Sequence, residues 1–565
     1  MKILQLHVDF IEYKPIKKEL ASAEEIGEPV PVRKENLLVL FTAVEKGDDV
    51  ELGDRAILEA KKFAQNLKVN SVLIYPFAHL SQNLSSPSEA FEVLKSMENK
   101  AKSEGLETFR APFGWNKSLE VKVKGHPLAE MSRSYSKAKA ELKEPVQAQR
   151  QLGEHELLAK IKRSDFKGLP DTDHRTIGEK LDLFSFQEPS PGMVYWHPKG
   201  LVLYETLKNF IRSELAKLGY KEISTPGLAN TTLWDVSGHS AHYKDNMFLT
   251  KLGNEEFGLK PMNCPSSFLI YKSRKWSYKE LPVKYSIFDP LFRNELSGVA
   301  SGLFRVKVLT QDDAHIIITK EKALEGIEEI LGLMERLYGV FGLSFKAKLS
   351  TRPDDSMGSD EEWEEATNIL KSALEKKGIN YEIKSKEGNF YSPKIDVDIK
   401  DSMGREWQCA TIQTDMQMPK KFKLTYVGED GKEHTPIVLH RAIYGSLERF
   451  IGVLLEHFKG KLPIWLSPVQ VRVIPVSDSN VEYGEQVLSM LRKSNFRVEG
   501  NFESGTLGSK IKVAQEEKIP YMLIVGEKEQ SSQSVAVRTR EGKIDYGVSL
   551  ADFEKTIADK IALFE

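Results

Sequence analysis

Hydrophobic residues near the N-terminus alternate with polar ones at the two-residue period of a β-strand. Leucine, valine and phenylalanine take every second position of residues 4–10, and a continuous apolar run covers residues 37–44. Residues 51–68 instead repeat their apolar positions at helical spacing, and residues 71–75 again indicate a strand. This pattern predicts a compact α/β module over residues 1–138.

The middle of the chain mixes helical and strand patterns. Residues 139–180 are rich in lysine, glutamate, alanine and glutamine, which predicts an exposed helical linker. A helix over residues 201–218 is predicted to end at Gly219, because glycine is common just beyond a helix C-terminus. A second long helix, with an apolar face from Ile443 to Phe458, closes a predicted α+β domain over residues 181–460.

Strand and helix patterns alternate once more toward the C-terminus. Strands are predicted over residues 469–476 and 521–525, and a helix over residues 480–494. Ser549 precedes the last helical pattern, where a serine side chain commonly caps a helix. The sequence therefore predicts a third, α/β domain over residues 461–565.

Length and composition agree with a multidomain globular protein. The chain has 565 residues, which at about 150 residues per domain suggests three or four domains. Hydrophobic residues make up 40% and charged residues 29%, as in ordinary globular chains. Its N-terminus becomes polar too early for a secretory signal, and no apolar run reaches the roughly 18 residues of a membrane span. We therefore expect a cytoplasmic protein with no membrane partner.

Net charge and the number of cysteines indicate how the chain could bind RNA and in which kind of compartment it is found. The 80 lysines and arginines nearly balance the 82 aspartates and glutamates, so any RNA partner must be bound by local patches. The two cysteines, Cys264 and Cys409, cannot form a disulfide framework and are typical of a reducing compartment.

Dense polar clusters interrupt apolar segments of the middle domain. They comprise Phe292 to Glu295 with Arg305, Thr310 to His315, His440-Arg441, and Glu448-Arg449. Arginine, aspartate and histidine that are buried together often surround a polar or anionic ligand. Taken singly, each cluster fits a structural ion pair equally well. The glycine-rich loops of P-loop and dinucleotide-binding proteins are not found in the sequence.

Together, these motifs resemble the class II threonyl-tRNA synthetases. The matching segments are Pro261 to Pro265, Phe292 to Glu295, Thr310 to His315, Trp407 to Thr411, and His440 to Arg449. The resemblance runs from Asp173 to the C-terminus and implies a class II catalytic core on an antiparallel sheet. It also implies a homodimer, with the interface in helix 201–218 and the strand that ends at Pro226.

The resemblance implies roles in ATP binding. Arg293 and Arg449 would be the catalytic arginines, because attack of a carboxylate on phosphorus needs charge neutralisation more than a base. Glu295 would accept a hydrogen bond from the adenine amino group, and Arg305 would hold phosphates. Mg²⁺ would accompany the nucleotide. The implied ATP-binding residues are Arg293, Glu295, Arg305, Leu309, Gln408, Thr411, Ser446 and Arg449, with Leu309 replacing a common aromatic.

The family also has a substrate-binding zinc ion, one per chain, whose ligands match Cys264, His315 and His440. These residues are 51 and 125 positions apart, so spacing alone would not have suggested them; a buried cysteine or a hydrogen-bonded core histidine is the simpler interpretation of each. One thiolate and two imidazoles leave an open position on zinc. The implied threonine-binding residues are Met262, Gln311, Asp313, Tyr391 and Gln413.

The two ends of the chain resemble tRNA-specific modules. The N-terminal module is similar to the editing domain of archaeal threonyl-tRNA synthetases, which is related to D-aminoacyl-tRNA deacylases. Its matching motifs imply an editing site made of His79, Lys117, His126 and Glu130. The C-terminal domain resembles the class IIa anticodon-binding fold, in which Glu529 and Arg538 would read bases of the anticodon.

These resemblances imply a threonine–tRNA ligase that forms threonyl-adenylate from threonine and ATP, charges tRNA(Thr) and hydrolyses mischarged Ser-tRNA(Thr). Serine lacks only a methyl group, which a pocket can discriminate by about 1–3 kcal/mol, so a separate editing step is expected. Two alternatives stand beside this interpretation. One is a non-catalytic or trans-editing tRNA-binding paralogue, and the other is a class II synthetase for another amino acid, such as proline or serine.

Overall fold

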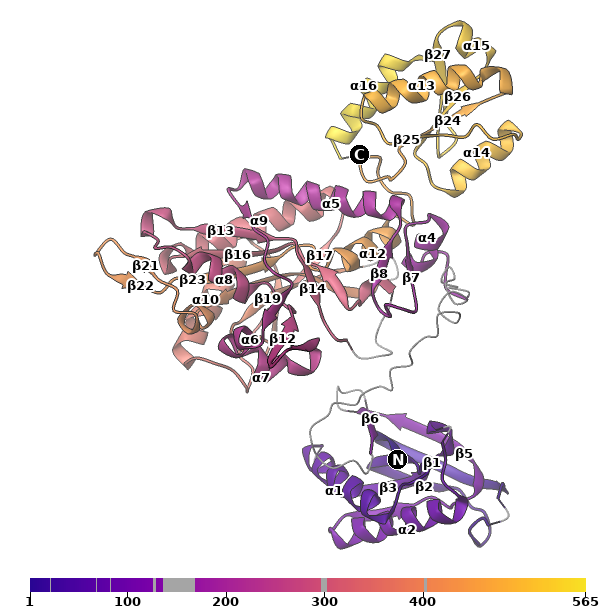
Figure 1. The fold of residues 1–565 in the computed structure, drawn as a ribbon, viewed down its shortest axis with the longest axis vertical. Coiled ribbons are helices and arrows are strands. Elements are labelled where there is room, and N and C mark those ends of the chain that lie inside the picture. The colour runs from indigo at the N-terminus through magenta and orange to yellow at the C-terminus, as the bar shows by residue number, and fades with distance from the viewer. Residues whose placement is uncertain are drawn as a thin grey trace. The chain divides into compact units, whose positions relative to one another are not determined.

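The computed structural model describes residues 1–20, 22–67, 69–81, 83–124, 129–135, 168–295, 302–400 and 404–564. The chain divides into two compact units, Met1–Gln151 and Leu152–Glu565 (Figure 1). Most of the predicted linker, from residue 139 to residue 167, lies outside the described residues. Its remaining part contains helix α4 (His174–Lys180), which buries His174, Ile177 and Gly178, so the prediction of an exposed linker is wrong for this helix. No helix in the described ranges is both long and apolar enough to cross a lipid bilayer.

In its described residues, the first unit is a six-stranded sheet with two α-helices, which confirms the predicted α/β module. The strand order is β4-β3-β2-β1-β5, and β6 also pairs with β1. Helices α1 (Val50–Asn66) and α2 (Pro87–Ser103) begin at Asp49 and Ser86, whose side chains accept hydrogen bonds from the first turn. The strands are β1 (Lys2–Lys18), β2 (Val32–Ala43), β3 (Ser71–Pro76), β4 (Glu107–Arg110), β5 (Trp115–Val123) and β6 (Glu130–Ser134).

The two faces of this sheet carry different side chains. One face packs aliphatic residues such as Leu38 and Ile74 against α1 and α2. The other face buries an aromatic cluster of Tyr13, Phe41 and Tyr75, with Phe77 packed against it. The ring centroids of Tyr13 and Tyr75 are 5.7 Å apart, and those of Phe41 and Tyr75 are 4.9 Å apart. We call this second surface the aromatic face.

The second unit contains an eight-stranded sheet that is antiparallel through its centre. Its order is β18-β17-β19-β20-β23-β16-β13-β9, and only the two outermost pairings are parallel. The fold class of the core is thereby confirmed. Its strands are β9 (Lys221–Glu222), β13 (Val283–Ile287), β16 (Asp313–Ile318), β17 (Phe345–Ser350), β18 (Tyr381–Lys384), β19 (Lys394–Lys400), β20 (Glu406–Asp415) and β23 (Ile437–Ala442).

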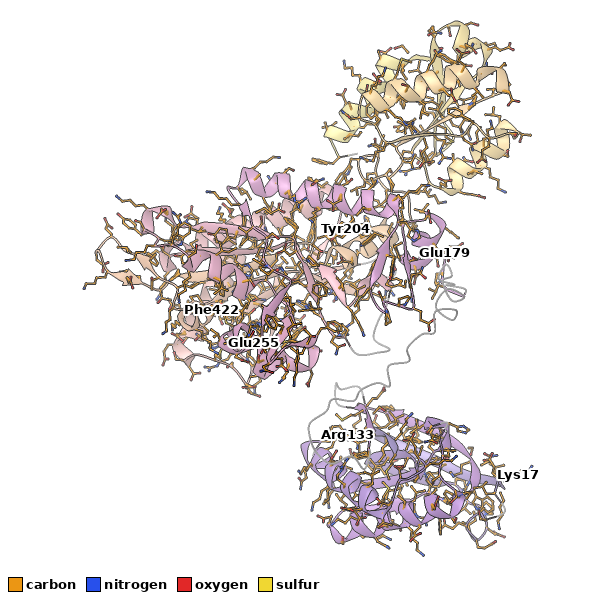
Figure 2. The ribbon with its side chains drawn as sticks, in the orientation of Figure 1. Lys17, Arg133, Glu179, Tyr204, Glu255 and Phe422 are labelled. Atoms are coloured by element: carbon orange, nitrogen blue, oxygen red, sulfur yellow. The ribbon has the colours of Figure 1, made fainter. Side chains whose placement is uncertain are left out.

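Long helices bury their apolar sides against this sheet. Residues of α5 (Pro198–Lys217), α9 (Ala323–Val340), α10 (Asp360–Lys376) and α12 (Leu447–His457) join the sheet in one large core. Tyr204 of α5, labelled in Figure 2, packs its ring 5.3 Å from that of Trp196.

Shorter elements surround the large sheet. The helices are α6 (Thr232–Ser237), α7 (His239–Tyr243), α8 (Cys264–Lys272) and α11 (Met418–Lys421). The strand pairs are β7 (Phe184–Phe186) with β8 (Val194–Trp196), β14 (Pro290–Phe292) with β15 (Val308–Thr310), and β21 (Tyr426–Val427) with β22 (Glu433–His434). A small three-stranded sheet consists of β10 (Leu228–Asn230), β12 (Glu255–Leu259) and β11 (Leu249–Leu252).

The predicted helix that begins at Ile443 starts four residues later in the structure. Gly445 has a φ of +71°, and a Cβ atom at this position would lie 2.5 Å from the carbonyl oxygen of Cys409. The side chain of Ser446 then accepts a hydrogen bond from the backbone N–H of Arg449. A left-handed glycine followed by a capping serine starts the helix at Leu447. Ile443 therefore belongs to the turn before α12.

The C-terminal part is a five-stranded sheet with helices, as predicted. Its strand order is β25-β24-β26-β27-β28. Ser549 caps the last helix by accepting a hydrogen bond from the backbone N–H of Asp552. The elements are β24 (Val471–Pro475), α13 (Val481–Lys493), β25 (Val498–Gly500), α14 (Leu507–Glu516), β26 (Tyr521–Val525), α15 (Glu527–Ser531), β27 (Ser534–Thr539), β28 (Ile544–Ser549) and α16 (Leu550–Ala562).

Candidate active and editing sites

A polar cavity of about 290 Å³ lies among strands β16, β20 and β23 and the start of α8. These segments come from distant parts of the sequence and meet because the antiparallel sheet places their ends side by side. The structure thereby brings together the residues predicted for zinc and threonine. The predicted residues that line the cavity are Met262, Cys264, Arg293, Gln311, Asp313, His315, Tyr391, Gln408, Thr411, Gln413 and His440.

Cys264, His315 and His440 form a buried group in this cavity. One potential ligand atom of each residue lies within 4.8 Å of the other two. His315 and His440 are direct cross-strand partners on β16 and β23, so their side chains share one face of the sheet. Their ring centroids are 4.8 Å apart. Cys264 reaches the same point because it is the first residue of α8.

The chemistry of this group fits a metal ion. The Nε2 atom of His440 lies 2.9 Å from a carboxylate oxygen of the buried Asp415, so Nε2 donates and Nδ1 keeps a free lone pair. The Nδ1 atom of His315 is buried and has no hydrogen-bond partner among the described residues. Burial lowers the pKa of His315 to about 4, which keeps its imidazole neutral and able to coordinate.

The thiol of Cys264 would need a cation to ionise. Burial raises its pKa well above the ordinary value, and the nearby carboxylates of Asp313 and Asp415 act in the same direction. A bound divalent ion would supply the positive charge that a thiolate requires here. Phe268 covers the group, with its ring centroid 5.9 Å from that of His315, and packs in turn on Phe422, labelled in Figure 2.

Three of the predicted threonine-binding residues, Asp313, Tyr391 and Gln413, are held by hydrogen bonds around this group. The hydroxyl of Tyr391 donates to the side-chain oxygen of Gln413 at 2.7 Å. The carboxylate of Asp313 accepts from the side-chain amide of Asn263 at 3.1 Å. Asn263, which the sequence analysis did not single out, is fully buried and lines the cavity. These bonds fix polar groups that could bind the amino and hydroxyl groups of a small amino acid.

Arg293 follows strand β14 and points into the same cavity. Its Nε atom donates to the carbonyl oxygen of Pro261 at 3.3 Å, and its backbone is held by Lys307. Glu295 and Arg305 lie on the two sides of the undescribed segment 296–301 and form an ion pair at 2.9 Å. Arg305 is exposed, which leaves its guanidinium accessible to an anionic ligand.

Arg449, in the first turn of α12, is fixed by two backbone carbonyl groups. It donates from Nε to the oxygen of Phe304 at 3.0 Å and from Nη1 to the oxygen of Gln408 at 2.8 Å. Burial lowers the pKa of Arg449, and the cationic Arg293 and Arg305 act in the same direction, with Cys409 and Glu295 opposing. Three guanidinium groups near one another, one of them desolvated, suit a polyanionic ligand.

The other predicted ATP-binding residues have structural partners. Gln408 and Thr411 both donate to the carboxylate of Asp396. Ser446 caps α12, and Leu309 is buried in a small cluster with Leu291 and Val306. Glu295, Arg305, Leu309, Ser446 and Arg449 do not line the described cavity.

Sequence reasoning missed further polar residues of the cavity, among them Tyr243 and Lys394. Both line it, and the ammonium group of Lys394 lies 2.8 Å from the carboxylate of Asp396. Neither residue lies in a recognisable motif, so only the fold places them here. Asn263, by contrast, lies inside the segment Pro261 to Pro265 and could have been selected from it.

Lys117 lies at the aromatic face of the first unit, on strand β5. Its ammonium group donates to the carbonyl oxygens of Pro112 at 2.8 Å and of Trp115 at 2.9 Å, and lies 5.1 Å from the centroid of the Tyr75 ring. Burial lowers the pKa of Lys117 to about 8, against the opposing charges of Glu19 and Glu24. This lysine is therefore poised to change charge near neutral pH.

Two other predicted editing residues are exposed on the same unit. The ring of His79 lies 5.4 Å from that of Phe77, which belongs to the aromatic face. Glu130 is the cross-strand partner of Leu6, which is buried in the aromatic cluster, so Glu130 projects from this face as well. His126 lies outside the described residues.

The predicted anticodon-reading residues lie close to the sheet of the C-terminal part. Glu529, in α15, accepts a hydrogen bond from the backbone N–H of Gly526 at 3.1 Å. Arg538, on β27, has a buried Nε atom, for which the described part of the chain supplies no hydrogen-bond partner.

Comparison with known protein families divides the chain into three matching regions. Residues 1–135 match the archaea-specific editing domain of threonyl-tRNA synthetase. Residues 248–458 match the class II tRNA synthetase core domain of the G, H, P, S and T enzymes. Residues 470–560 match the anticodon-binding domain.

Individual relatives agree with these matches. The threonine–tRNA ligase of Desulforamulus reducens is 50% identical over 390 residues, which cover 69% of this chain and 61% of the relative. That of Clostridium tetani is 51% identical over 382 residues, 67% of this chain and 60% of the relative. The chain thus spans less than two thirds of the length of these curated relatives.

One solved structure is matched over almost all of its own length. The RNA-binding domain of threonyl-tRNA synthetase from Cryptosporidium parvum is 40% identical, with a TM-score of 0.67, and the match covers 69% of this chain and 98% of that one. The chain belongs to the threonyl-tRNA synthetase family.

Proposed function

We propose that this protein is a threonine–tRNA ligase that also hydrolyses mischarged Ser-tRNA(Thr). The observation that carries this proposal is one cavity that joins the buried Cys264–His315–His440 group to Arg293. A soft, nitrogen- and sulfur-rich site beside an arginine can hold the polar groups of an amino acid and its reacting carboxylate at the same time.

The residues of the site have different roles in adenylate formation. Zinc held by Cys264, His315 and His440 would supply a Lewis acid for the amino and hydroxyl groups of threonine. Arg293 binds the carboxylate and the α-phosphate as they react, while Arg305 and Arg449 neutralise the rest of the triphosphate, which carries Mg²⁺.

The other proposed parts serve the tRNA. Residues 1–138 form the editing domain, residues 139–180 a linker, residues 181–460 the catalytic domain and residues 461–565 the anticodon-binding domain. Glu529 and Arg538 read anticodon bases of tRNA(Thr). The enzyme acts as a cytoplasmic homodimer whose interface includes α5.

ATP–pyrophosphate exchange with single amino acids tests the synthetic function. Threonine should support exchange about 10–200-fold better than serine, since one methyl group separates the two. Valine should be about 10⁴-fold worse than threonine, because it cannot replace the hydroxyl group. Proline should support no exchange. Binding of tRNA without any threonine-dependent exchange would instead identify a non-catalytic paralogue.

The editing reaction is proposed at the aromatic face. Water attacks the ester between serine and the terminal ribose of the tRNA, and negative charge develops on the carbonyl oxygen. Both hydrogen bonds of the Lys117 ammonium group and its position over the Tyr75 ring favour the charged form. Lys117 therefore stabilises the oxyanion, and His79, His126 and Glu130 position the substrate and the water.

We expect Lys117→Met to lower Ser-tRNA(Thr) hydrolysis by about 100- to 1,000-fold, with threonine charging unchanged. A lysine with a pKa of about 8 is cationic below this pH and neutral above it. The enzymatic hydrolysis rate, corrected for spontaneous ester hydrolysis, should therefore fall as the pH rises through about 8.

The measurement is deacylation of preformed Ser-tRNA(Thr) by the full chain between pH 6 and pH 9. Lys122→Met is the matched control, because Lys122 lies on the same strand but is exposed and pairs with Asp9. A rate that rises through pH 8 would make Lys117 a general base instead. Equal hydrolysis by the wild type and Lys117→Met would remove this residue from the mechanism.

A further inference from the structure

A buried histidine outside the cavity joins helix α4 to helix α12. His174 is fully buried, and its Nδ1 atom lies 2.9 Å from a carboxylate oxygen of Glu456. Its Nε2 atom accepts a hydrogen bond from the backbone N–H of Leu303 at 3.0 Å. A backbone N–H can only donate, so Nε2 is the acceptor and Nδ1 carries the proton that bonds Glu456.

These hydrogen bonds leave the cluster without a free ligand atom for a metal. Asp173, His174 and Glu456 offer atoms within 4.8 Å of one another. Both ring nitrogens of His174 are already bonded, however, and Asp173 is held by both the side chain and the backbone N–H of Arg175. The second oxygen of Glu456 accepts from Arg405 at 2.9 Å. The cluster is therefore a closed hydrogen-bond network whose carboxylates are balanced by arginines.

This network holds the segment Gly302–Arg305 by packing as well as by hydrogen bonding. Gly302 has a φ of +55°, and a Cβ atom there would lie 2.3 Å from Nε2 of His174. The ring of Phe304 lies 4.2 Å from the His174 ring and stacks on Trp407 at 4.0 Å. The histidine thus fixes the path of the backbone immediately before Arg305.

The segment Gly302–Arg305 also contacts α12 at Arg449. The carbonyl oxygen of Phe304 accepts the hydrogen bond from Nε of Arg449 at 3.0 Å. Glu456 and Arg449 belong to one helix, so the contacts form a ring that runs from Glu456 through His174, Leu303 and Phe304 back to Arg449. The backbone before Arg305 and the guanidinium of Arg449 are therefore held by one connected set of contacts.

We propose that His174, oriented by Glu456, is a positioning residue for adenylate formation. It holds Gly302–Arg305 so that Arg305 and Arg449 are preorganised around the triphosphate before ATP binds. The inference rests on the proposed function, because it assigns those arginines to ATP. A misplacement of about 1 Å between reacting groups can cost about 100-fold in rate, so a distant anchor can affect catalysis strongly.

Two substitutions separate the two hydrogen bonds of His174. Glutamine places a carbonyl oxygen near the position of Nε2 and can still accept from Leu303, whereas asparagine can donate only near the position of Nδ1. We expect His174→Asn to raise the KM for ATP by about tenfold or more and to lower kcat, with the KM for threonine changed by less than about twofold. His174→Gln should restore most of the lost exchange activity.

The assay is threonine-dependent ATP–pyrophosphate exchange by the full chain, normalised to active sites. His457→Gln, next to Glu456 on the same helix, is the control and should behave as the wild type. If His174→Asn does not fold, Gly302→Ala tests the same contact from the other side and should reproduce the effect on ATP.

The outcomes distinguish this inference from the proposed function. A wild type without threonine-dependent exchange would contradict the proposed function. The positioning role would be overturned if the wild type is active and the folded His174→Asn and Gly302→Ala variants both have a normal KM for ATP. Equal increases in the KM values for ATP and threonine, or a His174→Gln variant as impaired as His174→Asn, would do the same.

Discussion

Replacement of Arg293 by alanine is expected to slow threonine-dependent ATP–pyrophosphate exchange by about 1,000-fold or more. Its guanidinium is the only one of the three proposed phosphate-binding groups that lines the described cavity. A fork-shaped, permanently charged group can contact the carboxylate and the phosphate together, and alanine leaves both charges uncompensated as they approach. Because this contact strengthens during reaction, the loss should appear in kcat and should not be recovered at high threonine concentration.

Pre-steady-state adenylate formation in an active-site titration measures this effect directly. Arg274→Ala is a suitable control, since Arg274 is exposed and its ion pair with Glu280 lies at the surface. Arg449→Ala should show a comparable loss. Near-normal adenylate formation by both Arg293→Ala and Arg449→Ala would contradict the proposed assignment of the ATP site.

Loss of the metal is expected to abolish threonine activation. We predict that His315→Ala removes bound zinc and lowers exchange by about 1,000-fold or more, while the protein stays folded, because the sheet around His315 is closed by many other buried residues. Two protein ligands remain in this variant, fewer than the three that an open zinc site normally uses.

Metal analysis of purified protein and circular dichroism test this prediction together. Cys409→Ser should keep its zinc, because Cys409 is buried in the large core and is not a member of the Cys264–His315–His440 group. Chelator-treated wild type should lose exchange and regain it when zinc is added. Full threonine-dependent exchange by a protein shown to be free of zinc would exclude the proposed role.

Local sequence patterns predicted the secondary structure well where a single feature, such as two-residue alternation or a capping serine, determines the element. The alternation in residues 4–10 became β1, and Ser549 caps α16 as expected. The predicted start of α12 was too early, because the spacing of apolar residues carries no information about the close contact between Gly445 and the carbonyl oxygen of Cys409. Gly445 and Cys409 are 36 residues apart in the sequence, so their contact depends on the tertiary structure.

The polar clusters could not be divided from the sequence into ligand-binding residues and structural ion pairs. Asp312 and Arg441 looked like candidates for ligand binding, but the carboxylate of Asp312 accepts from Arg441 and from the backbone N–H groups of Ile443 and Gly445. Burial raises the pKa of Asp312 to about 7, and these donors oppose that shift. Arg293 and Arg441 both line the cavity, but the guanidinium of Arg441 is bonded to Asp312, whereas that of Arg293 donates to the backbone carbonyl of Pro261. The two roles differ only in the partner that lies opposite, which spacing along the chain does not reveal.

The pairing of His315 with His440 links the metal site to the assembly of the sheet. Successive residues of a strand point to opposite faces, so a shift of β23 by one residue against β16 would turn His440 away from His315. A misaligned chain would therefore lose one ligand, His440, from the pocket while its secondary structure stayed almost unchanged. Zinc stoichiometry then serves as a measure of strand register, and a molecule that folds incorrectly at this point cannot activate the amino acid at all.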